Sequence, residues 1–327
     1  MYAKFFYTLG IFLCLILFIY SGYFAYKLEF HAEKQVKDKD KKTYLHHIVL
    51  VPEELDNDYW KLIERGAKKA AKESNVLLEY QGPKQANLEE HIKLIEMAAA
   101  SKVDGIMMQG LSEELSTPLI NKIMDKGIPV ITVDTDAAQS NRVAYIGTDN
   151  YYSGFLAGKA LIEGTGGKAK VGIVTGSFTA ANQKLRVQGF RDAVEYNKGI
   201  KIIAIEESNI TRVEAADKSF KLLKEHPEIN AFFGTSALDG IGIEKAVDQL
   251  GLLNQIYIIS FDALPETITY LDKGVIDATI VQEPYEMGYR AVKMMVQQLE
   301  GKEIPKVNLT ETKVIHKEDL PLIPGKS

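Results

Sequence analysis

The chain has 327 residues, of which 46% are hydrophobic and 25% are charged, so it is long enough to bury the cores of two domains. Its net charge of −5 provides no basic field of the kind that holds nucleic acid through its phosphates. The single cysteine, Cys14, excludes an internal disulfide and a cysteine-based zinc site. The composition therefore predicts a folded protein without a nucleic-acid partner.

An uncharged stretch lies near the N-terminus, between Phe5 and Tyr26. Its length is about that of a helix that crosses a bilayer, and it exceeds the apolar region of about 7 to 15 residues in a signal peptide. We therefore predict that residues 1–26 form an uncleaved membrane anchor, with a cleaved signal segment as the alternative. Residues 27–44 are rich in lysine and predict a charged stalk.

The charges beside this stretch disagree about its orientation. Lys4 and the N-terminal amine favour a cytoplasmic N-terminus, whereas the six lysines from Lys27 to Lys42 favour a cytoplasmic stalk. Long domains are translocated largely regardless of such charges. The charge rule alone therefore leaves the side of the membrane open.

From residue 45 onward, short β-branched apolar stretches alternate with amphipathic ones. This alternation predicts an α/β fold of two doubly wound lobes, in which helices cover both faces of parallel sheets. The predicted strands are 47–51, 76–80, 103–109, 129–134, 143–148, 170–176, 202–208, 231–236, 256–262 and 277–282. The predicted helices include 59–74, 88–100, 116–126, 152–163, 182–196, 213–225 and 285–299.

Polar and aromatic residues follow several of the predicted strands, at the edge where doubly wound sheets bind ligands. Carboxylates and amides form hydrogen bonds with hydroxyls, and aromatic rings cover the apolar face of a sugar ring. These strand ends therefore predict a polyol site. The residues are 56–60 after the first strand, and then Asp134, Thr135, Ser236, Asp262 and Gln282.

The polar residues after the strands also have a purely structural interpretation. Asp56, Asn57 or Asp58 is placed to cap the helix that follows the first strand. Asp134 and Asp262 are residues that are common in turns. Their shared position at one edge of the sheets is what favours ligand binding.

Three further residues have two interpretations each. Arg186 is a solvated helix arginine or a ligand contact. Tyr59 and Trp60, the only tryptophan, form a hydrophobic entry to the core or a binding surface. Because neighbours on a helix point in different directions, we expect at least one of the two rings to lie outside the core.

No motif of a cofactor-dependent enzyme is present. The first strand is not followed by G-x-G-x-x-G, and "EGTGGKAK" lacks the Ser or Thr that follows the lysine of a P-loop. The stretch "DTDAAQS" lacks the glycine and distal glutamate of a calcium loop. His46 and His47 point to opposite faces of a strand, which is poor zinc geometry. We therefore predict a protein that is not an enzyme and holds no cofactor or metal.

The span from Leu45 to about Lys317 resembles the ribose-binding-protein branch of the type I periplasmic binding proteins. The resemblance is carried by "DNDYW", "VITVDTDAAQSNRVAYIGTDNYYSGFLAGKAL", "HPEINAFFGTSALDGIGI" and "IISFDALPETITYLDKGVIDATIVQEPYEMG". It implies two Rossmann-like lobes that are joined by a three-strand hinge. The N-terminal lobe would comprise residues 45–148 plus 283–311, and the C-terminal lobe residues 149–282 plus 312–327.

The resemblance also implies which residues contact the ligand. Tyr59 and Trp60 match the paired aromatics that enclose a sugar. Thr135 stands where an arginine is usual, and Ser236 where an asparagine is usual, so the implied ligand is a monosaccharide or cyclitol without ribose being specified. The residues that match polar contacts are Asn57, Asp134, Arg186, Asp262 and Gln282.

In function, the resemblance implies a sugar-binding protein outside the cytoplasmic membrane that delivers its ligand to an ABC permease. The alternative is a tethered sensor that presents the sugar-bound state to a membrane histidine kinase. An anchor without a lipoprotein motif favours this sensor role. LacI-type repressors share the lobes but carry a helix-turn-helix where this chain has the uncharged stretch. A repressor or an enzyme is therefore the least expected function.

Overall fold

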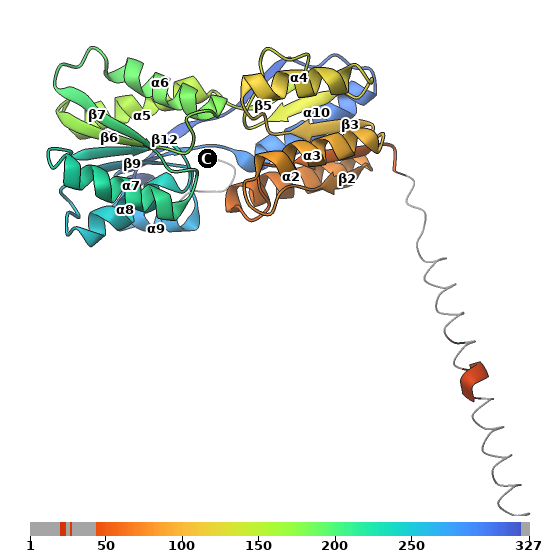
Figure 1. Cartoon of the computed structure of the whole chain (residues 1–327), viewed down its shortest axis with the longest axis horizontal. Coiled ribbons are helices and arrows are strands. Elements are labelled where there is room, and N and C mark those ends of the chain that lie inside the picture. The colour runs from red at the N-terminus through yellow and green to blue at the C-terminus, as the bar shows by residue number, and fades with distance from the viewer. Residues whose placement is uncertain (1–19, 24–26, 28–43, 322–327) are drawn as a thin grey trace, which may run out of the picture. The chain divides into compact units, whose positions relative to one another are not determined.

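The computed structural model describes residues 20–23, 27 and 44–321. The described residues from Leu45 onward form one compact unit (Figure 1). The predicted anchor and stalk fall almost entirely outside the described residues. Among those that are described, no helix is both long enough and apolar enough to cross a bilayer.

The first of two six-stranded sheets belongs to the N-terminal lobe, and its strand order is β11-β5-β4-β3-β1-β2. All its neighbouring strands are parallel. The strands are β1 (His47–Val51), β2 (Leu77–Tyr80), β3 (Gly105–Met108), β4 (Val130–Val133), β5 (Ala144–Thr148) and β11 (Val307–Thr310). Its helices are α2 (Asp58–Ser74), α3 (Leu88–Ala100), α4 (Glu113–Met124) and α10 (Pro284–Leu299).

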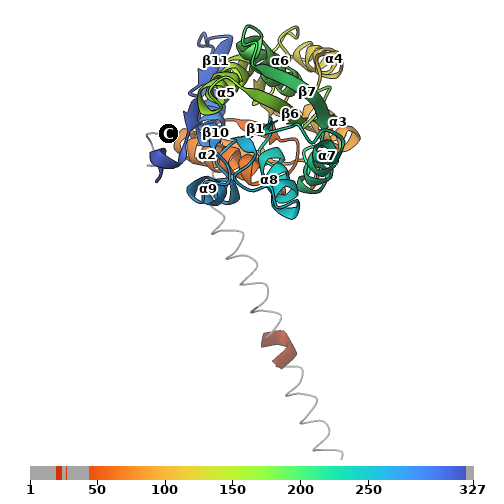
Figure 2. The ribbon, with the colours of Figure 1, turned by 90° about the vertical axis from the view of Figure 1, so that its left-hand side faces the viewer.

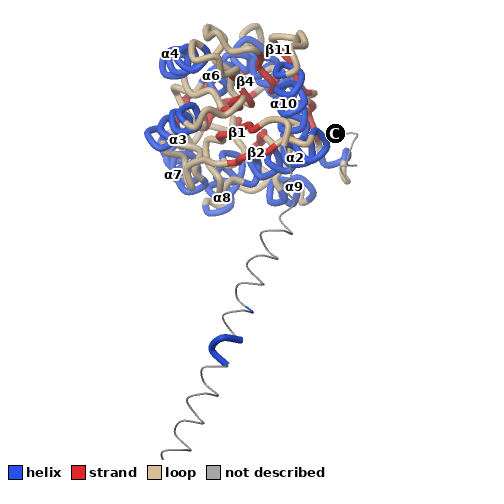
Figure 3. The backbone as a smooth tube through the Cα atoms, turned by 90° about the vertical axis from the view of Figure 1, so that its right-hand side faces the viewer, coloured by secondary structure: helices blue, strands red, loops and turns tan. Residues whose placement is uncertain are grey.

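Alternation along the strands explains why helices cover both faces of this sheet. In β1, Ile48 and Leu50 pack in the core with α2 and α10, whereas Val49 and Val51 pack in the core with α3 and α4. Figure 3 shows the strands between these two pairs of helices. Each large apolar side chain that is fully buried contributes about 1.5 to 3 kcal/mol of hydrophobic stabilisation.

The second sheet belongs to the C-terminal lobe, and its strand order is β12-β10-β9-β8-β6-β7. Helices α5 and α6 cover one face, and α7, α8 and α9 cover the other (Figure 2). The strands are β6 (Ala169–Thr175), β7 (Ile200–Glu207), β8 (Ala231–Gly234), β9 (Tyr257–Phe261), β10 (Ala278–Val281) and β12 (Lys313–Ile315). The helices are α5 (Asn150–Gly164), α6 (Ala181–Val194), α7 (Arg212–Glu225), α8 (Asp239–Gln249), α9 (Pro265–Asp272) and the 3-10 turn η1 (Lys317–Asp319).

The chain passes between the two sheets three times, after β5, after β10 and after β11. The last passage corrects the expectation of purely parallel sheets, because β12 pairs with β10 in the antiparallel direction. Neither β11 nor β12 was predicted. Both are short and only partly buried, so their sequences lack the apolar run that marks the inner strands.

Glycines allow α5 and α6 to cross closely, which matters for the position of Arg186. A Cβ atom at Gly154 would lie 1.9 Å from the carbonyl oxygen of Arg186, and one at Gly189 would lie 2.0 Å from that of Tyr151. No larger residue fits at either position without moving a helix. The close crossing therefore holds the backbone of Arg186 against α5, at the end of α6 that faces the other lobe.

Candidate ligand-binding cleft

The carboxyl ends of strands from both sheets meet at one cavity, as expected for doubly wound lobes. The N-terminal lobe supplies the segments after β1, β3 and β4, and the C-terminal lobe supplies α6 and the segments after β7, β8, β9 and β10. Of the predicted site residues, Thr135, Asp56 and Asp58 do not line this cavity, and all the others do. The lining residues are Glu53, Asn57, Tyr59, Trp60, Gln109, Asp134, Ala180, Asn182, Gln183, Arg186, Ile210, Ser236, Ala237, Asp262 and Gln282.

Asp134 is the centre of the polar network in the N-terminal lobe. Its Oδ1 accepts a hydrogen bond of 2.6 Å from the Tyr59 hydroxyl, and its Oδ2 accepts bonds from Gln109 at 3.3 Å and Thr135 at 2.9 Å. Thr135 therefore lies behind the cavity and holds the carboxylate in place. Burial, together with the nearby Asp134 charge, raises the pKa of Tyr59 well above its usual value, so this hydroxyl remains a donor.

Arg186 is buried in the cleft, with 2% of its surface exposed, so its interpretation as a solvated helix residue is wrong. Its Nε donates to Asn150 at 2.8 Å, and its two terminal nitrogens donate to the Thr235 carbonyl at 2.9 Å and to Gln282 at 3.1 Å. The guanidinium carbon also lies 3.8 Å from the centre of the Phe261 ring. These contacts fix the orientation of the positive charge at the site.

Asp262 is the acidic residue of the C-terminal lobe at this cavity. Its Oδ1 accepts a hydrogen bond of 2.7 Å from Gln282. Burial raises the pKa of Asp262 to about 6, while the charge of Arg186 acts in the opposite direction. Asp134 and Asp262 have φ angles of 67° and 64°, a left-handed conformation that Asp tolerates better than most residues. Both residues therefore lie at bends directly after their strands, and this conformation is compatible with a position in the cavity.

Both aromatic rings at the start of α2 are buried, which corrects the expectation that one lies outside the core. Tyr59 is 7% exposed and Trp60 is 2% exposed, and both pack in the core cluster of α2 and α10 while lining the cavity. Their rings are perpendicular, with centroids 6.0 Å apart. Asn57 caps α2, because its side chain accepts a 2.9 Å bond from the Tyr59 amide. Asn57 also lines the cavity, so its capping role does not remove it from the candidate site.

Ser236 presents an unsatisfied hydroxyl to the cavity. It is 4% exposed, and its Oγ has no hydrogen-bond partner among the described residues. Asp239 holds this segment by accepting a bond of 2.8 Å from the Ser236 amide. A buried hydroxyl without a partner costs about 1 to 3 kcal/mol, which a ligand with its own polar groups would recover.

Four polar lining residues were missed by the sequence analysis: Glu53, Gln109, Asn182 and Gln183. Gln109 directly follows the buried strand β3. The rule that ligand contacts follow the carboxyl ends of the strands, which we call the strand-end rule, therefore predicts it. Asn182 and Gln183 lie one turn before Arg186 on α6, and only the crossing of α5 and α6 brings that turn to the cleft. Burial raises the pKa of Glu53 to about 7, with a further contribution from the Asp134 charge.

The cavity is nearly filled by the side chains of the two lobes. Its volume is about 50 Å³, room for roughly three or four water molecules. Thr148 of the N-terminal lobe donates a hydrogen bond of 2.6 Å to Gln282, which follows β10 of the C-terminal lobe. A sugar must therefore displace contacts of this kind or separate the lobes before it can enter.

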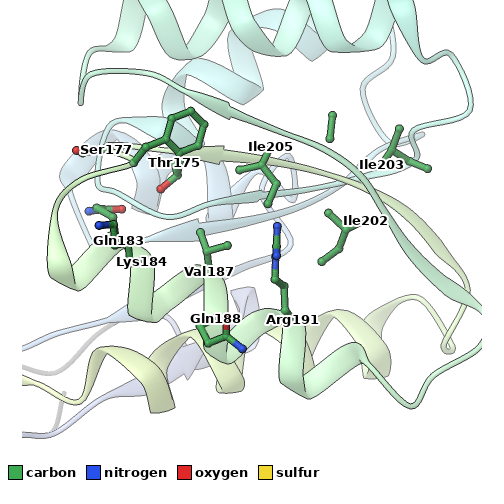
Figure 4. A pocket seen from close by; sticks show the side chains of 12 residues that line it. Thr175, Ser177, Gln183, Lys184, Val187, Gln188, Arg191, Ile202, Ile203 and Ile205 are labelled. Atoms are coloured by element: carbon green, nitrogen blue, oxygen red, sulfur yellow. The ribbon is translucent and has the colours of Figure 1, made fainter.

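A larger cavity of about 750 Å³ lies between α6 and β7 (Figure 4). Only the C-terminal lobe lines it, with Val187, Ile202 and Ile205 as its apolar part and the side chain of Arg191 beside them. Among the described residues, no group of three or more His, Cys, Asp or Glu side chains is placed to hold a metal ion. Of these two cavities, only the one at the strand ends joins both lobes.

Comparison with known proteins establishes the family. The model of the periplasmic binding protein domain matches residues 48–303 of this chain. The chain belongs to the periplasmic binding protein family. The prediction of this family and of a two-lobe α/β fold is confirmed. The relatives are binding proteins, which agrees with the prediction that this protein is not an enzyme.

Several relatives of this periplasmic binding protein are similar over most of their length. The D-allose-binding periplasmic protein of Escherichia coli (strain K12) is 24% identical over 80% of this chain and 87% of that protein. The crystal structure of GanP, a glucose-galactose binding protein from Geobacillus stearothermophilus, is 65% identical, covers 85% of this chain and 99% of its own, and has a TM-score of 0.84. The XylFII-LytSN complex contains a chain that is 41% identical, covers 84% of this chain and 99% of its own, and has a TM-score of 0.80.

Proposed function

We propose that this protein binds a monosaccharide or cyclitol in the cleft between its lobes. One observation carries the proposal: two carboxylates, from Asp134 and Asp262, face the same cavity as the Arg186 guanidinium and two aromatic rings. Relatives named for allose, ribose, and glucose and galactose support the same ligand class. The ligand contacts are the predicted set, namely Asn57, Tyr59, Trp60, Asp134, Arg186, Ser236, Asp262 and Gln282, with Thr135 acting through Asp134.

The chemistry of these groups suits a neutral polyol. The carboxylates accept hydrogen bonds from hydroxyls, and the guanidinium and the Gln282 amide donate to ring or hydroxyl oxygens. Trp60 and Tyr59 supply apolar surface for the C–H groups of the ring. We take residues 45–148 with 283–311 as one closing lobe and residues 149–282 with 312–327 as the other, which move about the three connections.

The proposed location is outside the cytoplasmic membrane, with the uncharged stretch from Phe5 to Tyr26 as the anchor. In that position the protein collects sugar and delivers it to an ABC permease. Relatives named as import binding proteins support this role.

The second candidate is a sensor that presents its sugar-bound state to a membrane histidine kinase. The XylFII-LytSN complex favours it, because a chain 41% identical to this one occurs there in a complex with another protein. Co-purification of the full-length protein from membranes, with and without sugar, tests which partner is bound. A permease among the captured proteins supports delivery, and a kinase supports sensing.

A thermal-shift screen of the full-length protein against monosaccharides and cyclitols tests ligand binding itself. A ligand at 100 times its dissociation constant adds about 2.7 kcal/mol to the free energy of unfolding, well above the noise of the method. Sugar phosphates and amino acids serve as controls of similar size. The proposal is wrong if no sugar or cyclitol stabilises the protein.

A further inference from the structure

A third cavity, which we call the outer chamber, adjoins the ligand-binding cavity. Its volume of about 540 Å³ lies within the range of about 300 to 1,000 Å³ that is typical of small-molecule sites. Four residues line both cavities, so the two lie next to each other: Glu53, Gln109, Ala180 and Ile210.

Both lobes form the walls of the outer chamber. The N-terminal lobe contributes the beginnings of α3 and α4, including His91 and Leu115. The C-terminal lobe contributes the segments after β6 and β7, including Gly176 and Ile210. Movement of the lobes therefore opens and closes this chamber together with the inner cavity.

His91 supplies an unused hydrogen-bond acceptor at the chamber wall. The side chain is 1% exposed, and its Nε2 has no partner among the described residues. Burial lowers the pKa of His91 to about 4, with the backbone of Val51 acting in the opposite direction, so the imidazole is neutral. In the neutral tautomer that carries its proton on Nδ1, Nε2 is an acceptor.

Gln109 supplies a second unused acceptor where the two cavities join. Its Nε2 donates to Asp134 at 3.3 Å and to Thr135 at 3.2 Å, which assigns the other amide atom as oxygen. That Oε1 is buried and has no partner among the described residues. The carboxyl group of Glu53 accepts a bond of 3.4 Å from the same Nε2 of Gln109, and it is a further polar group at this junction. The chamber therefore favours a ligand with several hydroxyl donors over an anion.

Ile210 places an apolar side chain between the two cavities at the expense of backbone strain. Asn209 and Ile210 have φ angles of 50° and 53°, and a β-branched residue with this conformation is a genuine outlier that tends to mark a functional site. A Cβ atom at Gly176 would lie 2.7 Å from Cγ1 of Ile210, so a larger residue at this position would displace the Ile210 side chain. The strained residue presents the kind of surface on which the C–H face of a sugar ring packs.

We propose that the cleft accepts a neutral disaccharide, with one ring in the inner cavity and the second ring in the outer chamber. The second ring donates hydroxyls to His91 and Gln109, and the linkage passes Ile210 and Ala180. The inference rests on the proposed sugar-binding function and extends its ligand class beyond a single ring.

Isothermal titration of the full-length protein tests this proposal with monosaccharides and with neutral disaccharides built from them, such as lactose, cellobiose, maltose and melibiose. At least one disaccharide is expected to bind as tightly as its component monosaccharide. Leu115→Trp narrows the chamber and is expected to weaken disaccharide binding about tenfold, while monosaccharide binding changes less than about twofold. Leu185→Trp, on the half-exposed face of α6 outside both cavities, is the matched control and should change neither affinity.

A second pair of variants tests the acceptor role of His91. His91→Leu removes the acceptor and is expected to weaken disaccharide binding about fivefold to tenfold, whereas His91→Gln keeps an acceptor and should retain most of it. The proposal is overturned if monosaccharides bind and no disaccharide does, which identifies the chamber as a water-filled entrance. It is also overturned if disaccharide affinity is the same in Leu115→Trp as in the wild type. Absence of binding by sugars of either length would instead contradict the proposed function itself.

Discussion

Asn182 on α6 donates a hydrogen bond of 3.3 Å to Oδ2 of Asp134, and this bond joins the C-terminal lobe to the N-terminal lobe across the cavity. Asp134 already accepts bonds from Tyr59, Gln109 and Thr135 within its own lobe. The carboxylate is therefore well placed to exchange its bond with Asn182 for one with a ligand hydroxyl. The same atoms that would bind a sugar also hold the lobes together without one.

This relationship predicts an effect on closure. Asn182→Asp places a second carboxylate against Asp134, so repulsion is expected to separate the lobes and increase the radius of gyration measured by small-angle X-ray scattering. The radius of gyration of the wild-type protein, in which Asn182 joins the lobes, should not increase when sugar is added. Asn197→Asp, on the loop after α6, is the control. An equal radius for Asn182→Asp and wild type would show that the Asn182 bond does not govern closure.

Asp262→Ala is expected to abolish or strongly weaken sugar binding. Each hydrogen bond lost with a buried partner costs about 1 to 3 kcal/mol, and more when one partner is charged. Since Asp262 has a φ of 64°, alanine also adds about 1 to 2 kcal/mol of backbone strain, so Asp262→Asn serves as a second variant that tolerates this conformation. Calorimetry measures affinity, and thermal unfolding confirms the fold. Asp248→Ala, on the exposed face of α8, is the control, and wild-type affinity in both Asp262 variants would remove Asp262 from the site.

The emission of Trp60 is expected to change as sugar binds, because this single tryptophan lines the cavity. The change should saturate with the dissociation constant obtained by calorimetry. Trp60→Phe should bind sugar with a moderate loss and show no such signal. Trp60→Ala should weaken binding by roughly 1.5 to 3 kcal/mol and also lower stability by about 3 to 5 kcal/mol, since Trp60 packs in the core as well. Constant emission through a saturating titration would assign Trp60 to the core alone.

The free energy of unfolding without sugar is expected to fall as pH rises from about 4.5 to about 7. Burial raises the pKa of Glu53 from 4.5 to about 7, and those of Asp239 and Asp262 from 3.8 to about 6. At these three carboxyl groups the folded state binds protons more tightly than the unfolded chain, so their stabilisation is complete below the unfolded pKa and is lost as pH rises through the folded pKa. The lowered pKa of His91 acts in the opposite direction, but at one group against three.

Urea unfolding across this pH range measures the effect. Glu53→Gln removes one of the titrating groups, so its stability should depend less steeply on pH. Glu300→Gln is the control, because Glu300 is exposed and its hydrogen bond to Lys302 lowers its pKa. An identical pH slope in Glu53→Gln and wild type would contradict the raised pKa of Glu53.

The uncharged stretch from Phe5 to Tyr26 predicts the topology of the protein in cells. Protease added to intact cells or protoplasts is expected to digest the lobes, because they lie outside the membrane in the proposed arrangement. A cytoplasmic protein should remain intact in the same sample as the control. Protection of the lobes would place them in the cytoplasm, as the lysines of the stalk suggest.

Much of the fold was determined by local sequence. Strands such as His47–Val51 and helices such as Leu88–Ala100 were predicted with their observed bounds, because apolar periodicity records which faces are buried. The strand-end rule also located Asp134, Asp262 and Gln282 at the cavity, since parallel strands carry their carboxyl ends to one edge.

Tertiary structure alone decided which of these side chains reach the cavity and which partners they form hydrogen bonds with. The close crossing of α5 and α6 buries Arg186 and places Asn182 within hydrogen-bond distance of Asp134. From the sequence, polar residues in such a helix are expected to be exposed to solvent. Thr135 follows Asp134 directly but lies behind the cavity, because adjacent residues at a strand end point in different directions. Contacts between residues far apart in the chain depend on how the lobes pack against each other, and periodicity carries no information about that packing.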